Sequence, residues 1–324
     1  MKVLFLGQAR HLEPWFGDVV QAVGDRHRVV LFDPDRPLAD QLRDVEVVVD
    51  QGGGVGTRAT VDAAAAAGVK LWQVLGTGMD HVDVEHIVGR GLLLANTPGP
   101  FSSVALAEHA LFLMLYFAKN FPAAQDHLRQ AIFYTPMNDE LDGRTLGLIG
   151  LGASARELAK RAAVFGMRIV GLDVQPPPPE VLATLGMTCL GGPDALQALA
   201  RQSDYLSVHV PLTRATRHMV DARALASMRP AAVLINVARG EVVDEVALVD
   251  ALRHRRIRGA GLDVFAAEPL PPQHPLLGLD NVVLTPHVAG VTIGTSRRRA
   301  RAVADNVQRI AQGLPPLYSI TKVE

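Results

Sequence analysis

The sequence predicts an α/β protein with two parallel β-sheets, each in its own domain. Short apolar segments rich in valine, leucine and isoleucine alternate with helical segments along almost the whole chain. Strands of this kind are apolar on both sides, which is typical of parallel sheets that helices cover on both faces. The chain of 324 residues is long enough for two domains of ordinary size.

The first set of strands lies in the N-terminal part of the chain. Helical segments such as residues 60–67 and 84–88 separate these strands. A long helix at residues 102–120 ends the set. Ser102 or Ser103 can cap this helix, and its apolar residues leave little polar surface, so we expect it to be buried. The predicted strands are residues 3–6, 29–32, 45–49, 71–75 and 92–95.

The second set of strands follows that helix. A final helix, residues 292–312, comes after the second sheet is complete and can return to pack on the first domain. We therefore expect residues 1–97 plus 291–324 to form one discontinuous domain, with residues 98–290 inserted as a second domain. The predicted strands are residues 146–149, 169–172, 205–208, 233–237, 261–264 and 282–284.

Composition argues against several classes of protein. A net charge of -1 argues against a general nucleic-acid or anionic-membrane partner. The longest uncharged apolar stretch, residues 110–118, is shorter than the ~20 residues that a membrane helix needs. The single cysteine, Cys189, cannot form an intrachain disulfide, so we expect a cytoplasmic protein in which it packs as an apolar residue. No spacing of histidine, cysteine and carboxylate residues suggests a metal site.

A glycine turn follows the predicted strand at residues 146–149. Gly150 permits the tight turn, Gly152 lets the backbone approach a phosphate, and Ala155 takes the place of a third glycine. The helix that begins near Ala153 would direct its free N–H groups and the positive end of its dipole toward that phosphate. The pattern predicts a Rossmann-like dinucleotide-binding domain.

An acidic residue follows this turn at the expected distance. Asp173 ends the next strand, about 20 residues after Gly152, where a carboxylate accepts hydrogen bonds from the adenosine ribose. Val174 and Gln175 come next, so no arginine follows to receive a 2′-phosphate. The pattern therefore favours NAD over NADP, the alternative being an ordinary strand-end aspartate beside a structural glycine turn.

Four ionisable residues follow the last strands of the second set. Arg239 is suited to a fork-like contact with a carboxylate. Asp263 and Glu268 follow the next strand, and His287 follows the last one, where a nearby glutamate would keep it protonated as a proton donor. Ligands of open α/β sheets bind beyond the carboxyl ends of the strands, so we expect one shared site. Taken singly, each residue would be a polar residue at a surface turn.

Ordered motifs along nearly the whole chain carry a resemblance to a known family. In their order they resemble the D-isomer-specific 2-hydroxyacid dehydrogenases. The resemblance implies Rossmann-like or flavodoxin-like domains, NAD as cofactor, and a homodimer formed through the nucleotide domain near residues 102–120. The motifs are residues 76–83 (GTGMDHVD), 96–99 (NTPG), 107–110 (AEHA), 150–152 (GLG), 236–240 (NVARG), 261–269 (GLDVFAAEP) and 285–290 (TPHVAG).

The resemblance implies a role for each matching residue. His287 would donate a proton to the ketone of a 2-keto acid as NADH delivers hydride, Glu268 would pair with His287, and Arg239 would bind the carboxylate and polarise the ketone. Asp263 would orient the nicotinamide carboxamide. The residues expected at the cofactor are Gly150, Gly152, Ala153, Ser154, Asp173, His209, Pro211, Val237, Ala238, Asp263, His287 and Gly290. The residues expected at the substrate are Gly54, Gly76, Thr77, Gly78 and Arg239.

Some positions depart from the family pattern or carry no chemistry. Ala153 and Ser154 stand where the family commonly has a polar or basic residue and then isoleucine, which removes a possible side-chain contact to phosphate. His209 is expected to form a wall of the cofactor site. His81 and His109 match family positions, and we expect them to be structural.

Three comparisons within the family narrow the substrate. Gly54 and Val55 stand where phosphoglycerate dehydrogenases have an arginine–serine pair, Thr77 stands where phosphite dehydrogenases have lysine, and Glu268 stands where formate dehydrogenases have glutamine. The remaining candidates are small unphosphorylated 2-keto acids such as glyoxylate or hydroxypyruvate, reduced to the D-2-hydroxy acid. The alternatives are a corepressor-like interaction protein that senses NAD(H) on the same fold, and a phosphoglycerate dehydrogenase.

Overall fold

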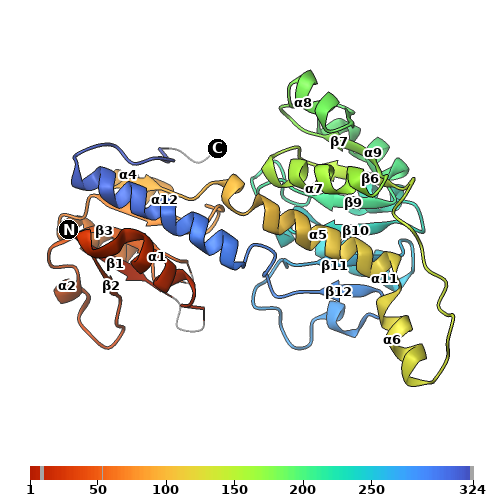
Figure 1. Cartoon of the computed structure of the whole chain (residues 1–324), viewed down its shortest axis with the longest axis horizontal. Helices are drawn as coiled ribbons and strands as arrows, with labels where there is room; N and C mark the ends of the chain where they lie inside the picture. Colours follow the sequence, from red (N-terminus) through yellow and green to blue (C-terminus); the bar gives the residue numbers. More distant parts are fainter. Residues whose placement is uncertain (8–10, 53, 322–324) are drawn as a thin grey trace. The chain divides into compact units, whose positions relative to one another are not determined.

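The computed structural model describes residues 1–7, 11–52 and 54–321, and the chain forms two compact units. The first unit is discontinuous and comprises Met1–Phe101 and Val291–Glu324, whereas the second comprises Ser102–Gly290. In Figure 1 the first unit is red to orange with a blue C-terminal part, and the second unit runs from yellow to light blue. Both units contain parallel sheets with helices on their faces, which confirms the predicted α/β class.

The first unit is built on a five-stranded sheet in the order β2-β1-β3-β4-β5. All neighbouring strands are parallel, and the order is the flavodoxin-like one. The strands are β1 (Lys2–Leu6), β2 (Arg28–Leu31), β3 (Val45–Asp50), β4 (Leu71–Val74) and β5 (Leu93–Ala95).

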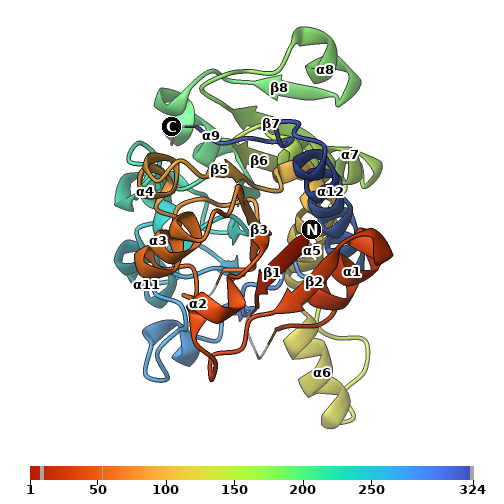
Figure 2. The same cartoon turned by 90° about the vertical axis from the view of Figure 1, so that its left-hand side faces the viewer.

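Helices cover both faces of this sheet. Helices α1 and α12 share one apolar cluster with alternate residues of β1 and β3, and α3 and α4 share another with the opposite face. Figure 2 shows these two pairs on opposite sides of the strands. The helices are α1 (Trp15–Val23), α2 (Leu38–Gln41), α3 (Arg58–Ala66), α4 (Val84–Gly89) and α12 (Ile293–Ala311), with 3₁₀ turns at Gly24–Arg26 and Gly99–Phe101.

The second unit is built on a seven-stranded parallel sheet in the order β12-β11-β10-β9-β6-β7-β8. The chain leaves β6 toward β7 and β8 and then returns to β9 on the other side, so the order reverses beside β6. Such a switch point is where open α/β sheets bind ligands. The strands are β6 (Thr145–Ile149), β7 (Arg168–Leu172), β8 (Met187–Cys189), β9 (Tyr205–Val208), β10 (Val233–Asn236), β11 (Gly259–Leu262) and β12 (Val282–Leu284).

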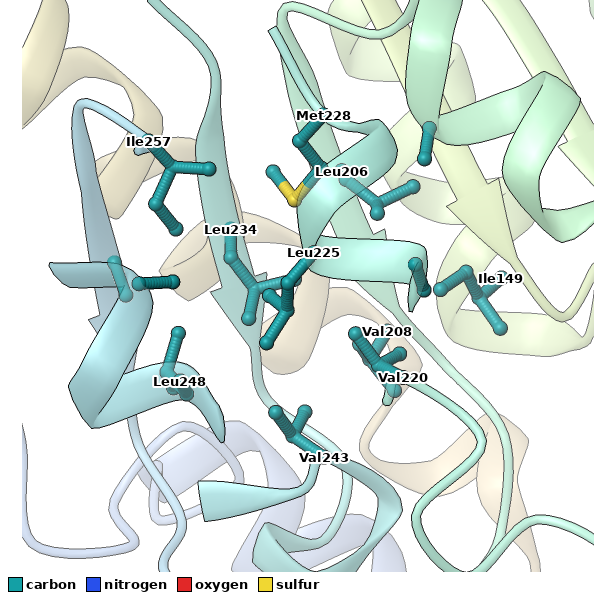
Figure 3. Packing of buried hydrophobic residues seen from close by; sticks show 14 of the residues in the cluster. Ile149, Leu206, Val208, Val220, Leu225, Met228, Leu234, Val243, Leu248 and Ile257 are labelled. Atoms are coloured by element: carbon teal, nitrogen blue, oxygen red, sulfur yellow. The ribbon is translucent and has the colours of Figure 1, made fainter. Parts of the chain in front are cut away.

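Two apolar clusters fix the faces of the seven-stranded sheet. Leu234 packs into one cluster with α9, α10 and α11, whereas its neighbours Val233 and Ile235 pack into the other with α5 and α7. Figure 3 shows Leu234 among Leu206, Leu225 and Leu248 in the first cluster. The helices are α5 (Ser103–Ala118), α6 (Phe121–Arg129), α7 (Ala153–Val164), α8 (Pro179–Thr184), α9 (Leu196–Gln202), α10 (Ala222–Ser227) and α11 (Glu245–Arg253), with 3₁₀ turns at Pro193–Ala195, Gly240–Val242 and Pro275–Gly278.

The structure corrects several expectations at this level. Ser102 makes no side-chain capping hydrogen bond to α5, because its backbone lies outside the extended region that a capping residue adopts. Helix α5 is not buried on all sides: its inner face packs on the sheet, but the Phe112 side chain is 49% exposed. The edge strand β8 and helix α6 were not predicted. Within the described ranges, no helix has the length and apolar character needed to cross a membrane.

Candidate active site and cofactor site

Three adjacent strands place Arg239, Glu268 and His287 at one edge of the seven-stranded sheet. Strands β10, β11 and β12 are parallel neighbours, and the three residues follow them in turn. The carboxyl ends of parallel strands meet at one edge, so residues far apart in the sequence share one site.

The side chains of His287 and Glu268 are hydrogen-bonded to each other. The distance between His287 Nδ1 and Glu268 Oε2 is 2.7 Å, and Glu268 Oε1 accepts a hydrogen bond of 2.9 Å from the backbone N–H of Phe265. Burial opposes ionisation of Glu268, but the hydrogen bonds from His287 and Phe265 and the charges of His287 and Arg239 outweigh it, so the pKa of Glu268 is lowered. The carboxylate therefore remains charged at neutral pH, and the bond to Nδ1 leaves Nε2 of His287 for proton transfer.

The loop that carries His287 is held by Asp263. His287 has a backbone φ of 54°, a left-handed conformation that is uncommon for a residue with a side chain. Its N–H donates to the backbone carbonyl of Asp263 at 2.8 Å. The Asp263 carboxylate accepts hydrogen bonds from the N–H groups of Val288 at 2.9 Å and Ala289 at 2.8 Å. Asp263 thus fixes the backbone of His287 and of the two residues after it, whereas its contact with nicotinamide stays a prediction.

Arg239 lies in a tight turn next to the segment that leads to Glu268. The Asn236 side chain closes this turn, since Oδ1 accepts from Ala238 N at 3.1 Å and Nδ2 donates to the Arg239 carbonyl at 2.9 Å. A Cβ atom on Gly240 would lie 1.9 Å from the carbonyl carbon of Phe265. Only glycine allows the two backbones to approach this closely, and the approach sets the separation of the Arg239 and Glu268 segments.

The glycine turn lies between β6 and α7. Gly150 has a φ of 88°, and a Cβ there would lie 2.7 Å from Cγ1 of Val210, so both backbone conformation and packing require glycine. Gly152 is the N-cap of α7, and no side chain caps the helix there. A Cβ on Gly152 would meet no atom within 4 Å. The side of Gly152 on which a Cβ would lie is therefore open, and the free N–H groups that begin a helix there fit the pyrophosphate of a dinucleotide. Ala155 is fully buried.

Asp173 connects the end of β7 to this turn. Its Oδ2 accepts a hydrogen bond of 2.6 Å from Leu151 N, and its Oδ1 accepts one of 2.9 Å from Gln175 N. Val174 and Gln175 are exposed beside it. The arrangement places a carboxylate next to the phosphate-binding turn, where it fits the ribose of a dinucleotide.

Ser154 and His209 form a hydrogen-bonded group beside the turn. Ser154 Oγ lies 3.0 Å from His209 Nδ1, and Ser207 Oγ lies 2.9 Å from His209 Nε2. Burial lowers the pKa of His209 to about 4, so the imidazole is neutral at physiological pH. His209 therefore adds no positive charge to this part of the site.

The other expected residues lie at strand ends of their own units. Pro211, Val237, Ala238 and Gly290 follow β9, β10 and β12 in the second unit, and Val237 is buried in the core. In the first unit Gly54 follows β3, and Gly76, Thr77 and Gly78 follow β4. Thr77 is well anchored there: its Oγ1 donates to the Thr97 carbonyl at 3.0 Å, and its carbonyl accepts from Asn96 at 3.0 Å.

Thr285, Gly240 and Ser207 contribute to the site although no role was predicted for them; Thr285 and Gly240 were identified only as members of the motifs at residues 285–290 and 236–240. Thr285 precedes the Pro286–His287 pair, so its place at a strand end was a usable signal. Gly240 follows Arg239 directly, and a glycine at that point is a mark of close backbone approach. Ser207 lies inside β9, and no local pattern distinguishes it from other buried strand residues.

Comparison with known proteins identifies the family. The model of the D-isomer specific 2-hydroxyacid dehydrogenase NAD binding domain matches residues 111–289. Glyoxylate reductase of Thermofilum pendens is 38% identical over 261 residues, 78% of this chain and 75% of that protein. D-3-phosphoglycerate dehydrogenase of Methanocaldococcus jannaschii is 36% identical over 278 residues, 85% of this chain but only 52% of that protein. The chain thus spans about half the length of that relative.

Solved structures show the same fold over the whole chain. The TT0316 protein from Thermus thermophilus has a TM-score of 0.81 and 31% identity, covering 99% of this chain and 100% of that one. A second match is NADPH-dependent glyoxylate/hydroxypyruvate reductase from Sinorhizobium meliloti in complex with citrate. It has a TM-score of 0.82 and 32% identity, covering 98% of this chain and 97% of that one. The fold, with its NAD binding domain, is that of a nucleotide-binding oxidoreductase. The chain belongs to the D-isomer specific 2-hydroxyacid dehydrogenase family, which confirms the resemblance seen in the sequence.

Proposed function

We propose that the protein is an NAD-dependent dehydrogenase that reversibly reduces a small unphosphorylated 2-keto acid to the D-2-hydroxy acid. The observation that supports this most directly is the 2.7 Å pair of His287 and Glu268 at adjacent strand ends, in the same unit as the glycine turn. Residues 102–290 would bind the nucleotide, and residues 1–101 with 291–324 would contribute the substrate loops at Gly54 and residues 76–78.

The proposed mechanism uses three side chains. NADH, when bound, supplies the hydride. Arg239 binds the substrate carboxylate and polarises the ketone, because its planar guanidinium matches a carboxylate with two N–H donors. His287 gives the proton on Nε2 to the ketone oxygen, and in the reverse direction takes it from the hydroxyl. Glu268 orients the ring through Nδ1 and stabilises its protonated form.

NAD is the proposed cofactor in preference to NADP. Asp173 places a carboxylate where a 2′-phosphate would be repelled, and Val174 and Gln175 offer no positive charge to receive one. Relatives differ in this respect, since the Sinorhizobium meliloti enzyme is described as NADPH-dependent. The ratio of kcat/KM for NADH and NADPH measures the preference.

Glyoxylate and hydroxypyruvate are the proposed substrate class. Relatives named glyoxylate reductase and hydroxypyruvate reductase are 38% and 37% identical to the chain. Phosphoglycerate dehydrogenase is the second candidate, because relatives with that name are 36% and 37% identical. Gly54 and Val55 favour the first, since neither side chain carries a charge for a phosphate.

An assay of NADH oxidation with a panel of 2-keto acids tests the proposal. The panel contains glyoxylate, hydroxypyruvate, pyruvate and 3-phosphohydroxypyruvate. We expect the highest kcat/KM for an unphosphorylated acid. Preference for the phosphorylated acid would identify a phosphoglycerate dehydrogenase, and tight NADH binding without turnover of any acid would favour the corepressor-like alternative.

A homodimer is the proposed assembly. Figure 1 shows α6 standing apart from the sheet of the second unit. Helix α6 and the segment after it expose large apolar side chains, which a second copy of the chain would cover. We refer to residues 121–137 as the apolar arm. Its exposed members are Phe121, Leu128, Ile132, Phe133, Tyr134 and Met137.

The proposed setting is the cytoplasm. The sequence has a single cysteine and a net charge of -1, which favour a reducing compartment and give no sign of a nucleic-acid or membrane partner. The proposed partners are therefore the small acid substrate and a second copy of the chain.

A further inference from the structure

We propose that His109 is a positioning residue for the reaction: through Thr285 and Asp263 it holds the loop that carries His287. This inference rests on the proposed function, because it assigns a role in the same site. His109 lies on α5, far from His287 in the sequence but in the same compact unit.

A chain of two hydrogen bonds links His109 to Asp263. His109 Nε2 lies 2.9 Å from Thr285 Oγ1, and Thr285 Oγ1 donates to Asp263 Oδ1 at 2.6 Å. A hydroxyl group has one proton, and Thr285 gives its proton to the carboxylate. Thr285 must therefore accept from His109, which defines Nε2 as the protonated ring nitrogen.

Asp263 passes this constraint to the two residues that follow His287. The oxygen that receives the Thr285 proton, Oδ1, also accepts from Val288 N at 2.9 Å, and Oδ2 accepts from Ala289 N at 2.8 Å. The left-handed backbone of His287 is uncommon for a residue with a side chain, so neighbouring hydrogen bonds have to hold it. Displacement of the carboxylate would release the backbone next to His287.

His109 acts in this chain as a neutral donor. Its Nε2 is 3.6 Å from Asp263 Oδ1, a distance compatible with an ion pair. Burial lowers the pKa of His109, however, and the Asp263 charge opposes this only in part, so the ring is neutral near pH 7. The direct contact is therefore weak, and Thr285 transmits the constraint.

The hydrogen bond between His109 and Thr285 is not needed to hold α5 against the sheet. The same helix is fixed to the sheet by Ala110, Leu113 and Met114, which are completely buried. Loss of the His109 contact is therefore expected to alter the loop more than the fold.

Two substitutions at His109 separate donor function from packing. His109→Leu fills similar space without a donor, whereas His109→Gln keeps an N–H group near the position of Nε2. We expect His109→Leu to lower kcat about tenfold, the effect of one lost hydrogen bond, with little change in NADH affinity. His109→Gln should recover most of kcat. Equal kcat in all three proteins, or equal loss in both variants, would overturn the proposal.

Thr285→Val tests whether Thr285 links His109 to Asp263, and it changes no residue of α5. If Thr285 transmits the effect, the double variant His109→Leu/Thr285→Val loses no more kcat than Thr285→Val alone. Losses that multiply would show that His109 acts by another route. His86→Leu is the matched control, because the His86 side chain is also 16% exposed and is bonded to Asp62 at 2.7 Å in the other unit. Its kcat should equal that of the wild type.

A spectroscopic readout separates this proposal from the proposed function. In the full-length protein, the ¹⁵N resonances of the His287 ring should shift in His109→Leu and return toward the wild-type values in His109→Gln. Unchanged resonances in His109→Leu would overturn the positioning role. Absence of turnover on every 2-keto acid in the wild type would overturn the proposed function alone, since the resonances are measured without substrate.

Discussion

Oε2 of Glu268 lies 2.7 Å from Nδ1 of His287, and the other carboxylate oxygen is bound by the backbone N–H of Phe265. One carboxylate oxygen of Glu268 is thereby bonded to the glutamate's own loop, and the other is bonded to His287 in the neighbouring loop. These contacts define the orientation of the imidazole and leave Nε2 as the nitrogen for the proposed proton exchange.

His287→Ala should lower kcat by ~10²-fold or more, because it removes the general acid. NADH affinity, measured by fluorescence titration, should be nearly unchanged. An unaltered kcat would show that another group donates the proton.

Glu268→Gln should lower kcat about tenfold at neutral pH. The pKa of Glu268 is lowered, so its carboxylate is charged across the neutral range and accepts the hydrogen bond from Nδ1 of His287 as an anion. A neutral amide oxygen in the same place makes a weaker hydrogen bond and holds the imidazole ring less firmly. The kcat of ketone reduction at pH 7 measures the effect, and an unchanged kcat would contradict the pairing as its source.

Asp173→Asn should reduce the preference for NADH over NADPH. The substitution keeps the size of the side chain but removes the charge that would repel a 2′-phosphate. The ratio of kcat/KM for the two cofactors should fall by about tenfold, equivalent to about 1.4 kcal/mol. The same ratio before and after substitution would assign Asp173 to the structure of the turn alone.

His209→Gln should make folding stability less dependent on pH. The pKa of His209 in the folded protein, about 4, is below its ordinary value of 6.5, so its contribution is complete above pH 6.5 and is lost as pH falls toward 4. Between neutral pH and about pH 5, the free energy of unfolding measured in urea should fall on the order of 2 kcal/mol further in the wild type than in the variant. If the free energies of unfolding of the two proteins fell equally with pH, protonation of His209 would not destabilise the fold.

Phe133→Asp combined with Tyr134→Asp should convert the proposed dimer into a monomer. Both side chains belong to the apolar arm and are 65% and 102% exposed in the single chain, and two charges there oppose burial against a second copy. Light scattering after gel filtration measures the mass. Val246→Asp is the matched control, since Val246 is 82% exposed on α11 outside the arm. A wild-type mass of one chain would refute the dimer.

The fold class and the family were the most predictable features of the molecule. Strand-to-helix alternation was sufficient for the α/β class, and the motifs around Arg239, Glu268 and His287 were sufficient for the family. Short elements were harder. Strand β8 has three residues at a sheet edge, too few to show a pattern, and the absence of a Ser102 cap depends on local backbone angles that composition does not encode.

Contacts between distant residues were beyond sequence reasoning. Asp263 was assigned to the cofactor by resemblance, but which atoms its carboxylate binds depends on how the turn after β12 folds back on β11. The bond between His109 and Thr285 spans most of the second unit in sequence and depends on the placement of α5 against the sheet. Neither has a local signal, because neither is made by neighbours in the chain.

The absence of a side chain at Gly240 also limits how the enzyme can be redesigned. The main chain of residue 240 rests against that of Phe265, so the separation of the Arg239 and Glu268 segments cannot be adjusted by placing a side chain at residue 240. Engineering of the proposed substrate preference therefore has to begin at other residues. Libraries that randomise residue 240 are expected to consist almost entirely of inactive members.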